Sequence, residues 1–131
     1  MFYIWTTDDG RVPAWEYMPC GAIAPKIGQA MVLNTSGQLA VASGGTAPTY
    51  ISMCDRETAL EAGTVIPVIR VNADIIFETT ASAAITSVKP GNKLTLSTDG
   101  LQVTATTESG VAEVISKDGD TAGNKVRVRF K

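Results

Sequence analysis

Residues 27–42 have the sequence IGQAMVLNTSGQLAVA, in which two short apolar runs flank the turn-forming segment NTSG. A second segment of this kind, AGTVIPVIRV, occupies residues 62–71. Short runs rich in β-branched and apolar residues, bounded by Gly, Asn and Ser, are typical of β-strands. Residues 27–80 are therefore predicted to form a series of short strands joined by turns, and they contain no set of residues typical of a catalytic site.

The C-terminal part, residues 85–131, shows the clearest strand pattern. Apolar and polar residues alternate in four segments: 93–97, 101–106, 111–115 and 125–130. Such alternation is typical of antiparallel sheets that bury one face. The residues expected to face inward are Leu94, Leu96, Leu101, Val103, Val114, Val126, Val128 and Phe130, and those expected to face solvent are Lys93, Thr95, Gln102, Thr104, Arg127 and Arg129. The predicted fold is mainly β, a small antiparallel barrel or sandwich.

One helical signal interrupts the strands. Asp55 is a good N-cap residue for a turn that runs to Glu61, and Gly63 stands where a left-handed C-terminal cap would lie. These residues predict at most one short helix, of no more than two turns.

Residues 1–26 form a predicted extended N-terminal arm rich in aromatic residues. Five of the eight aromatic residues of the chain lie there, namely Phe2, Tyr3, Trp5, Trp15 and Tyr17. Asp8-Asp9-Gly10 supplies turn chemistry, which predicts a hairpin between residues 2–6 and 11–18. Residues 27–131 are predicted to form one compact β domain, with subdomains 27–80 and 85–131 as the alternative.

The five aromatic residues of the arm are the candidate partner-binding residues. Large aromatic side chains contribute much contact area at low conformational cost, and binding hot spots use them for this reason. The alternative is that these rings close one end of the protein's own core.

Composition and charge argue against several classes of partner. The net charge of −2 comes from 11 basic and 13 acidic residues mixed along the chain, so neither nucleic acid nor an anionic membrane is expected as a partner. The first residues lack a basic leader followed by a long apolar stretch, so export is not expected. No apolar run approaches the roughly 20 residues that a membrane-spanning helix needs, and a soluble protein is expected.

Residues for catalysis or metal binding are scarce, and we expect neither an enzyme nor a cofactor. The chain has no histidine, which removes the usual partner of a serine or cysteine nucleophile and the common zinc signatures. A serine/lysine or paired-carboxylate site remains open.

Cys20 and Cys54 are expected to be reduced, buried residues, with a mutual disulfide as the alternative. Asp118 and Asp120 in the loop of residues 117–124 are expected to form a solvated turn, with a calcium site as the alternative.

Several segments together resemble a known family. They are Glu16-Tyr17-Met18-Pro19, residues 27–33, Gly37-Gln38-Leu39, Ala40-Val41-Ala42, residues 48–53 and Gly63-Thr64-Val65-Ile66-Pro67-Val68. Their order resembles the layout G-x-A-x-x-L … G-x-L … G … V-P-V of small head proteins of tailed phages and prophages, the capsid decoration or head-fibre proteins. The resemblance covers roughly the first eighty residues.

The resemblance implies a non-enzymatic role. Proteins of this family bind the outside of the assembled shell of major capsid protein, often as trimers, and stabilise it. It therefore implies the major capsid protein as partner, a homo-oligomer with a trimer favoured, and location in the virion after assembly in the host cytoplasm. On this hypothesis Trp5 and Trp15 are the anchors to the capsid or to a neighbouring protomer.

A stand-alone β-sandwich binding module, for example for glycans, is the alternative function. Such a module would carry exposed aromatic residues on a sheet face or in loops. Beyond the arm the chain offers only Tyr50, Phe77 and Phe130, which argues mildly against it.

Overall fold

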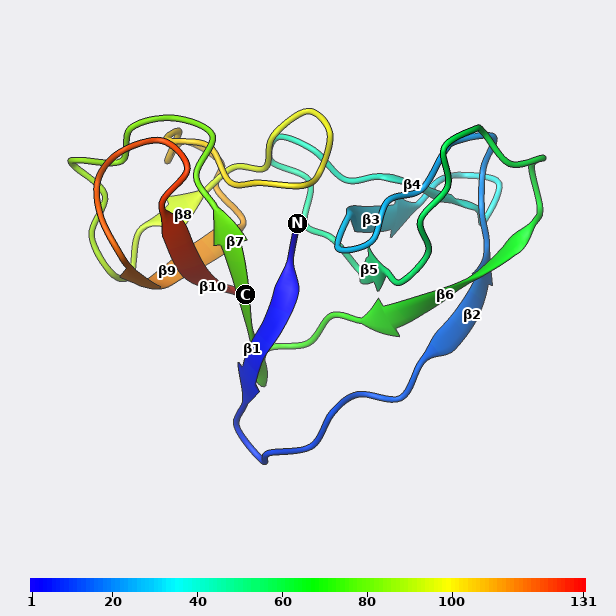
Figure 1. Ribbon diagram of the computed structural model, residues 1–131, viewed down its shortest axis with the longest axis horizontal. Helices are drawn as coiled ribbons and strands as arrows, with labels where there is room; N and C mark the ends of the chain where they lie inside the picture. The colour runs from blue at the N-terminus through cyan, green and yellow to red at the C-terminus, as the bar shows by residue number, and fades with distance from the viewer.

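The computed structural model describes all residues, 1–131, and contains β-strands but no helix (Figure 1). The strands are β1 (Tyr3–Thr7), β2 (Glu16–Pro19), β3 (Ala30–Leu33), β4 (Leu39–Val41), β5 (Tyr50–Ser52), β6 (Val65–Arg70), β7 (Ile75–Thr80), β8 (Lys93–Leu94), β9 (Ala112–Lys117) and β10 (Lys125–Phe130). With no helix in the chain, there is none long and apolar enough to cross a membrane.

The strands form two antiparallel sheets of five strands each. Sheet A has the order β1-β7-β10-β9-β8, and sheet B has the order β2-β6-β5-β3-β4. The sheets occupy opposite ends of the long axis of the molecule, and the segments 8–15 and 71–74 connect them (Figure 1). Neither sheet closes on itself, because each ends in two different edge strands. The predicted mainly β, antiparallel fold is therefore confirmed as a sandwich-like arrangement, and the barrel is excluded.

The larger core joins the two sheets. Its 18 buried residues include Phe77 and Phe130 of sheet A and Ile51 and Ile69 of sheet B. The ring of Phe130 lies 5.4 Å from that of Phe2 and 5.7 Å from that of Phe77, both in tilted arrangements that aromatic pairs favour. Sheets A and B thus share one hydrophobic core, and Phe2 brings the N-terminus into it.

Sheet B is apolar on both faces. Neighbouring residues on its strands alternate between the shared core and a second cluster, so Ile51 faces the first and Tyr50 the second. The second cluster consists of Cys20, Met31, Leu39, Tyr50, Cys54, Ile66 and Val68, with Met18, Ile23 and Leu60 packed against it. Segments 20–26 and 53–63 therefore act as a lid over this face of sheet B. Both cysteines are free and buried, as expected from the sequence.

The predicted N-terminal hairpin is wrong. A turn does form, with Gly10 N donating to Thr7 O, but the strands on either side of it join different sheets. β1 pairs with β7, whereas β2 pairs with β6. Burial of Phe2 in the shared core holds β1 in sheet A, and Met18 against the second cluster holds β2 in sheet B. Tertiary burial therefore outweighs the local turn signal.

The helical signal after Asp55 produces no helix, which agrees with the predicted limit of at most one short helix. Backbone donors in this segment bond across to segment 20–26 instead of along a helix: Arg56 N to Pro25 O, Leu60 N to Ile23 O and Gly63 N to Cys20 O. Gly63 does have a positive φ of 91°, but it leads into β6 and caps no helix. Covering the apolar face of sheet B satisfies these backbone groups as well as a helix would.

The predicted strand of residues 101–106 is reduced to isolated contacts. Val103 is buried and forms single bridges to Ala81 and Leu96, while Leu101 is only half-buried. Thr95, expected to face solvent, is buried, and its hydroxyl lies 2.6 Å from that of Thr104. A hydroxyl pair that satisfies itself can be buried at little cost, which the alternation of polar and apolar residues does not reveal.

Candidate functional site

The five aromatic residues of the N-terminal arm fall into three locations. Phe2 is fully buried in the shared core and is not accessible to a partner. Tyr3 and Trp5, each 52% exposed, lie on β1 at the edge of sheet A. Trp15 and Tyr17, 55% and 64% exposed, lie just before and within β2 at the edge of sheet B. The fold therefore separates the arm into two surface sites.

The first site lies on the face of sheet A that points away from the core. Antiparallel partners share a face, and the register places Tyr3 beside Glu78 and Glu78 beside Arg127. An irregularity between Ile4 and Thr6 interrupts the register of β1 at Trp5. Irregularities of this kind re-aim side chains. The Trp5 ring lies 5.3 Å below the guanidinium of Arg127. We call this surface, formed by Tyr3, Trp5, Glu78, Lys125 and Arg127, the outer face.

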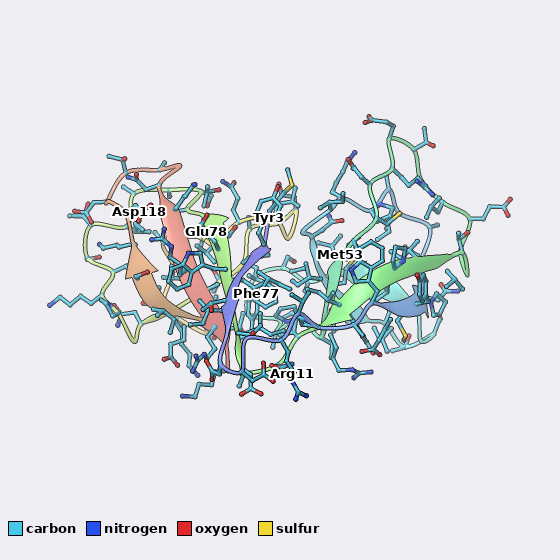
Figure 2. All side chains as sticks on the ribbon, turned by 60° about the horizontal axis from the view of Figure 1, so that its bottom comes forward. Tyr3, Arg11, Met53, Phe77, Glu78 and Asp118 are labelled. Atoms are coloured by element: carbon cyan, nitrogen blue, oxygen red, sulfur yellow. The ribbon has the colours of Figure 1, made fainter.

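Ion pairs cross the outer face from strand to strand. Arg127 Nε donates to Glu78 at 3.0 Å and its other nitrogens donate to Asp118, while Lys125 Nζ lies 3.6 Å from Glu78. The hydrogen bond with Asp118 raises the pKa of Arg127 above its ordinary value, so the guanidinium stays charged. Figure 2 shows Tyr3, Glu78 and Asp118 spread across this sheet, with Phe77 close by. The ion pairs hold Arg127, and through it Trp5, in a defined position.

The predicted solvent exposure of Arg127 and Arg129 is wrong in degree. The Arg127 side chain is only 17% exposed and the Arg129 side chain only 23% exposed, because carboxylates from three segments cover them. Arg129 pairs with Asp8 of the loop after β1 at 3.1 Å. These arginines join β10 to the N-terminal segment as well as facing outward.

A cavity opens beside the aromatic residues of the outer face. Its volume is about 280 Å³, and Met1, Tyr3, Glu78, Thr79, Thr80 and Lys125 line it. A carboxylate, an ammonium group and threonine hydroxyls thus stand next to a tyrosine ring. This combination offers hydrogen-bond donors and acceptors beside an apolar surface.

The second site is an apolar patch on sheet B. Tyr17 lies opposite Pro67 in the register of β2 and β6, so the two side chains share a face. Val65, two residues before Pro67, points to the same side and is 58% exposed. Trp15 adds a half-exposed ring just before β2. We call Trp15, Tyr17, Val65 and Pro67 the apolar patch.

The apolar patch continues the inner face of sheet B beyond the part that sheet A covers. Ile69, two residues after Pro67 on β6, is buried in the shared core. β2 and the neighbouring part of β6 extend to the end of the molecule away from sheet A (Figure 1). The apolar patch is therefore the solvent-exposed end of the sheet face whose other end is buried in the shared core.

The other face of β2 is polar at its start. Arg70 donates to both carboxylate oxygens of Glu16 at 2.9 Å and lies 5.1 Å over the ring of Tyr50. The hydrogen bond with Arg70 lowers the pKa of Glu16 below its ordinary value. This pair fixes β2 against β6 and so orients Tyr17 on the opposite face.

The two carboxylates of loop 117–124 are engaged by cations of the protein itself. Asp118 pairs with Arg127, and Asp120 pairs with Lys117 at 2.6 Å. No third metal-binding side chain joins them. The loop acts as a tie between β9 and β10.

Sequence reasoning found the exposed aromatic residues but missed their neighbours. Glu78, Lys125 and Arg127 come from β7 and β10, far from β1 in the chain, and only sheet pairing brings them to Tyr3 and Trp5. The sequence around Val65 and Pro67 predicted a strand but gave no sign that these residues lie on an exposed apolar surface. The alternation of arginines with apolar residues at 125–130 was the one available signal of a polar outer face.

Comparison with known proteins identifies a related fold. No protein-family model matches the chain, and none of the curated proteins matches it by sequence. Among solved structures, the crystal structure of the head fiber gp8.5 N base in bacteriophage phi29 is similar, with a TM-score of 0.56 and 14% identity over 90% of this chain and 95% of that chain. The resemblance to phage head-fibre proteins predicted from the sequence is therefore confirmed at the level of the fold, which this chain shares along nearly its whole length with the base of a head fibre.

Proposed function

We propose that the protein is a non-enzymatic structural protein of a phage or prophage head, which binds the outside of the capsid shell and stabilises it. The observation that carries this proposal is the likeness to the head fiber base, which covers 90% of the chain. The proposed partner is the major capsid protein, and the proposed location is the virion, after assembly in the host cytoplasm.

The apolar patch is the proposed contact with the shell. Trp15, Tyr17 and Val65 are all more than half exposed, although they lie on a face whose other end is buried. Burying apolar surface contributes about 25 cal/mol per Å², from which the cost of association must be subtracted. Aromatic residues at the centre of such a contact carry a large share of the binding free energy.

Repetition strengthens a modest contact. A shell presents many identical sites, and linked protomers would bind several of them at once, so that the apparent affinity exceeds that of one contact. We propose a homo-oligomer, with a trimer favoured, as the form that binds. Neither step requires covalent chemistry or a cofactor.

The test is co-sedimentation of the purified protein with assembled shells of the phage that encodes it. The double variant W15S/Y17S should lose shell binding while keeping the same thermal unfolding as the unmodified protein. Ile27→Ser, which also removes a partly exposed apolar side chain, is the matched control and should bind as before. Full binding by W15S/Y17S would show that the shell contact lies elsewhere.

Light scattering shows whether the apolar patch contacts the shell or a neighbouring protomer. If W15S/Y17S reduces the mass of the free oligomer to that of a monomer, the patch is a contact between protomers. If the mass is unchanged and shell binding is lost, the patch contacts the shell directly.

A further inference from the structure

We propose that the outer face of sheet A binds a neutral saccharide, at Tyr3 and Trp5 and the cavity beside them. This site uses a different sheet from the apolar patch, so it gives the protein a second binding activity that does not depend on the shell contact.

The two rings form a platform on one edge strand. Tyr3 and Trp5 both belong to β1, and both lie on the side of Arg127: the register places Tyr3 beside Glu78 and Glu78 beside Arg127, and the Arg127 guanidinium lies over the Trp5 ring. Each residue is 52% exposed, which leaves surface free for stacking. A sugar ring has apolar C–H faces and a polar rim, and an aromatic ring offers the apolar surface that such a face contacts.

The platform is ordered before any ligand binds. Arg127 covers the Trp5 ring from 5.3 Å, and the guanidinium is itself held by Glu78 and Asp118. The side chain of Arg127 is only 17% exposed. A side chain that is already fixed loses less conformational entropy on binding, which favours affinity for a small ligand.

The cavity supplies the polar contacts. Glu78 offers oxygen acceptors and Lys125 an ammonium donor. The Thr80 hydroxyl, which accepts from Gln102 Nε2, can still donate, and the Tyr3 hydroxyl, which donates to Met1 Sδ, can still accept. Sugar hydroxyls act as donors and acceptors, so this mixed set suits them. A volume of about 280 Å³ lies near the lower end of small-molecule sites, roughly 300 Å³, and suits a single sugar ring.

The balance of charge favours a neutral ligand. Glu78 is shared between Lys125 at 3.6 Å and Arg127 at 3.0 Å, and Asp118 provides the second carboxylate. Two cations therefore face two anions, and no excess charge remains to attract a phosphate or a polyamine. The outer face mixes polar groups with aromatic rings, whereas the apolar patch of sheet B is continuous apolar surface.

The test is titration of the full-length protein with a panel of neutral linear oligosaccharides that includes maltohexaose and chitohexaose. In a W15F background Trp5 is the only tryptophan, so its fluorescence reports directly on this face. We expect a saturable change in Trp5 emission with at least one member of the panel, and the same affinity by calorimetry.

Substitutions locate the site. Tyr3→Leu and Trp5→Leu keep apolar surface on β1 but remove the stacking rings, and each should weaken binding roughly tenfold or more by calorimetry. Glu78→Gln should also weaken binding, since it changes an acceptor in the cavity. Leu33→Ser alters another partly exposed apolar residue, 37% exposed on sheet B, and should leave saccharide binding unchanged.

Three outcomes would overturn the proposal. They are no saturable binding to any member of the panel, undiminished binding by folded Tyr3→Leu and Trp5→Leu proteins, and a concentration-dependent dimer that Trp5→Leu abolishes. The last outcome would assign the outer face to a second copy of the chain. Thermal unfolding of each variant establishes that the protein tested is folded.

Discussion

Phe2 differs from its aromatic neighbours at the scale of a single side chain. Its ring is fully buried between the two sheets and packs 5.4 Å from Phe130, whereas the adjacent Tyr3 ring is half in solvent. Alternation along β1 is enough to separate the two roles, because successive side chains of a strand point to opposite faces. One residue of the aromatic arm thus stabilises the fold while the next is free to bind.

Phe2→Ala should lower the free energy of unfolding by about 3 to 5 kcal/mol, the cost of truncating a buried phenylalanine. Tyr3→Ala should cost much less, because half of the Tyr3 side chain is already exposed. Urea unfolding followed by circular dichroism measures both. Equal losses for the two variants would contradict the separation of roles.

Gly28 is required for two reasons that can be measured separately. Its φ is +75°, and a Cβ there would lie 2.9 Å from the backbone nitrogen of Phe2, which donates to Gly28 O. Gly37 has a similar φ of +72° but nothing within 4 Å of its Cβ position. Gly37→Ala should therefore cost roughly 1 to 2 kcal/mol for the left-handed backbone alone, and Gly28→Ala should cost distinctly more. Thermal unfolding of the two variants compares these losses of stability. Equal losses would mean that the segment around Gly28 shifts to relieve the clash.

Asp99 makes stability depend on pH. The hydrogen bond from Ser97 Oγ at 2.6 Å, together with the backbone N–H of Leu101, lowers the pKa of Asp99 below its ordinary value of about 3.9. A depressed pKa in the folded state contributes stability above about pH 4, and this contribution is lost as the pH falls through the folded pKa.

Asp99→Asn should therefore be less stable than the unmodified protein near pH 6, and the difference should shrink as the pH falls below about 4. Urea unfolding of both proteins across this range gives the comparison. A difference that stays constant with pH would show that Asp99 acts without titrating.

At the scale of elements, β10 is the strand that the rest of sheet A depends on. It pairs with β7 on one side and β9 on the other, and its arginines reach Glu78, Asp118 and Asp8. The apolar residues of the same strand lie in the shared core. β10 therefore contributes apolar residues to the shared core and also the arginines whose ion pairs fix the side chains of the outer face.

Arg127→Met should destabilise the protein by about 1 to 2 kcal/mol, because it leaves Glu78, whose side chain is only 21% exposed, with Lys125 alone to pair with. Arg70→Met breaks the ion pair with Glu16, whose members are far more exposed, and should cost much less. The two variants are matched in chemistry and differ in burial. Similar losses in urea unfolding would mean that burial of Arg127 adds nothing.

At the scale of the whole molecule, the two sheets should unfold together. The chain passes between them at segments 8–15 and 71–74, and residues from both sheets form one core of 18 buried side chains. A single shared core favours one cooperative transition.

Deletion of residues 1–7 should unfold the entire chain, because it removes β1 and Phe2 from the shared core. The buried thiols report on sheet B: burial raises the pKa of Cys20, and both cysteines should resist labelling with a thiol reagent until the protein unfolds. In the truncated protein, both should label at once. Continued protection of Cys20 and Cys54 after the deletion would show that sheet B folds alone.

The amino-acid sequence by itself determined most of the segments that form strands and the concentration of aromatic residues near the N-terminus. Alternation at residues 125–130 and the β-branched run at 65–71 suffice for strands, because the two-residue period is a local property of the backbone. The sequence also resembles phage head-fibre proteins, and the structural comparison supports this resemblance at the level of the fold. The local turn signal at Asp8-Asp9-Gly10 did not give the expected hairpin, and the helical signal at Asp55 produced no helix.

Only the tertiary structure decided which strands pair and which residues meet on a surface. β1 and β2 join different sheets because Phe2 and Met18 are buried in different clusters, and no local turn preference outweighs that burial. Trp5 meets Arg127 across 122 positions of chain for the same reason. Pairing between distant strands depends on the apolar area that they bury together, and that quantity belongs to the folded molecule and to no single segment.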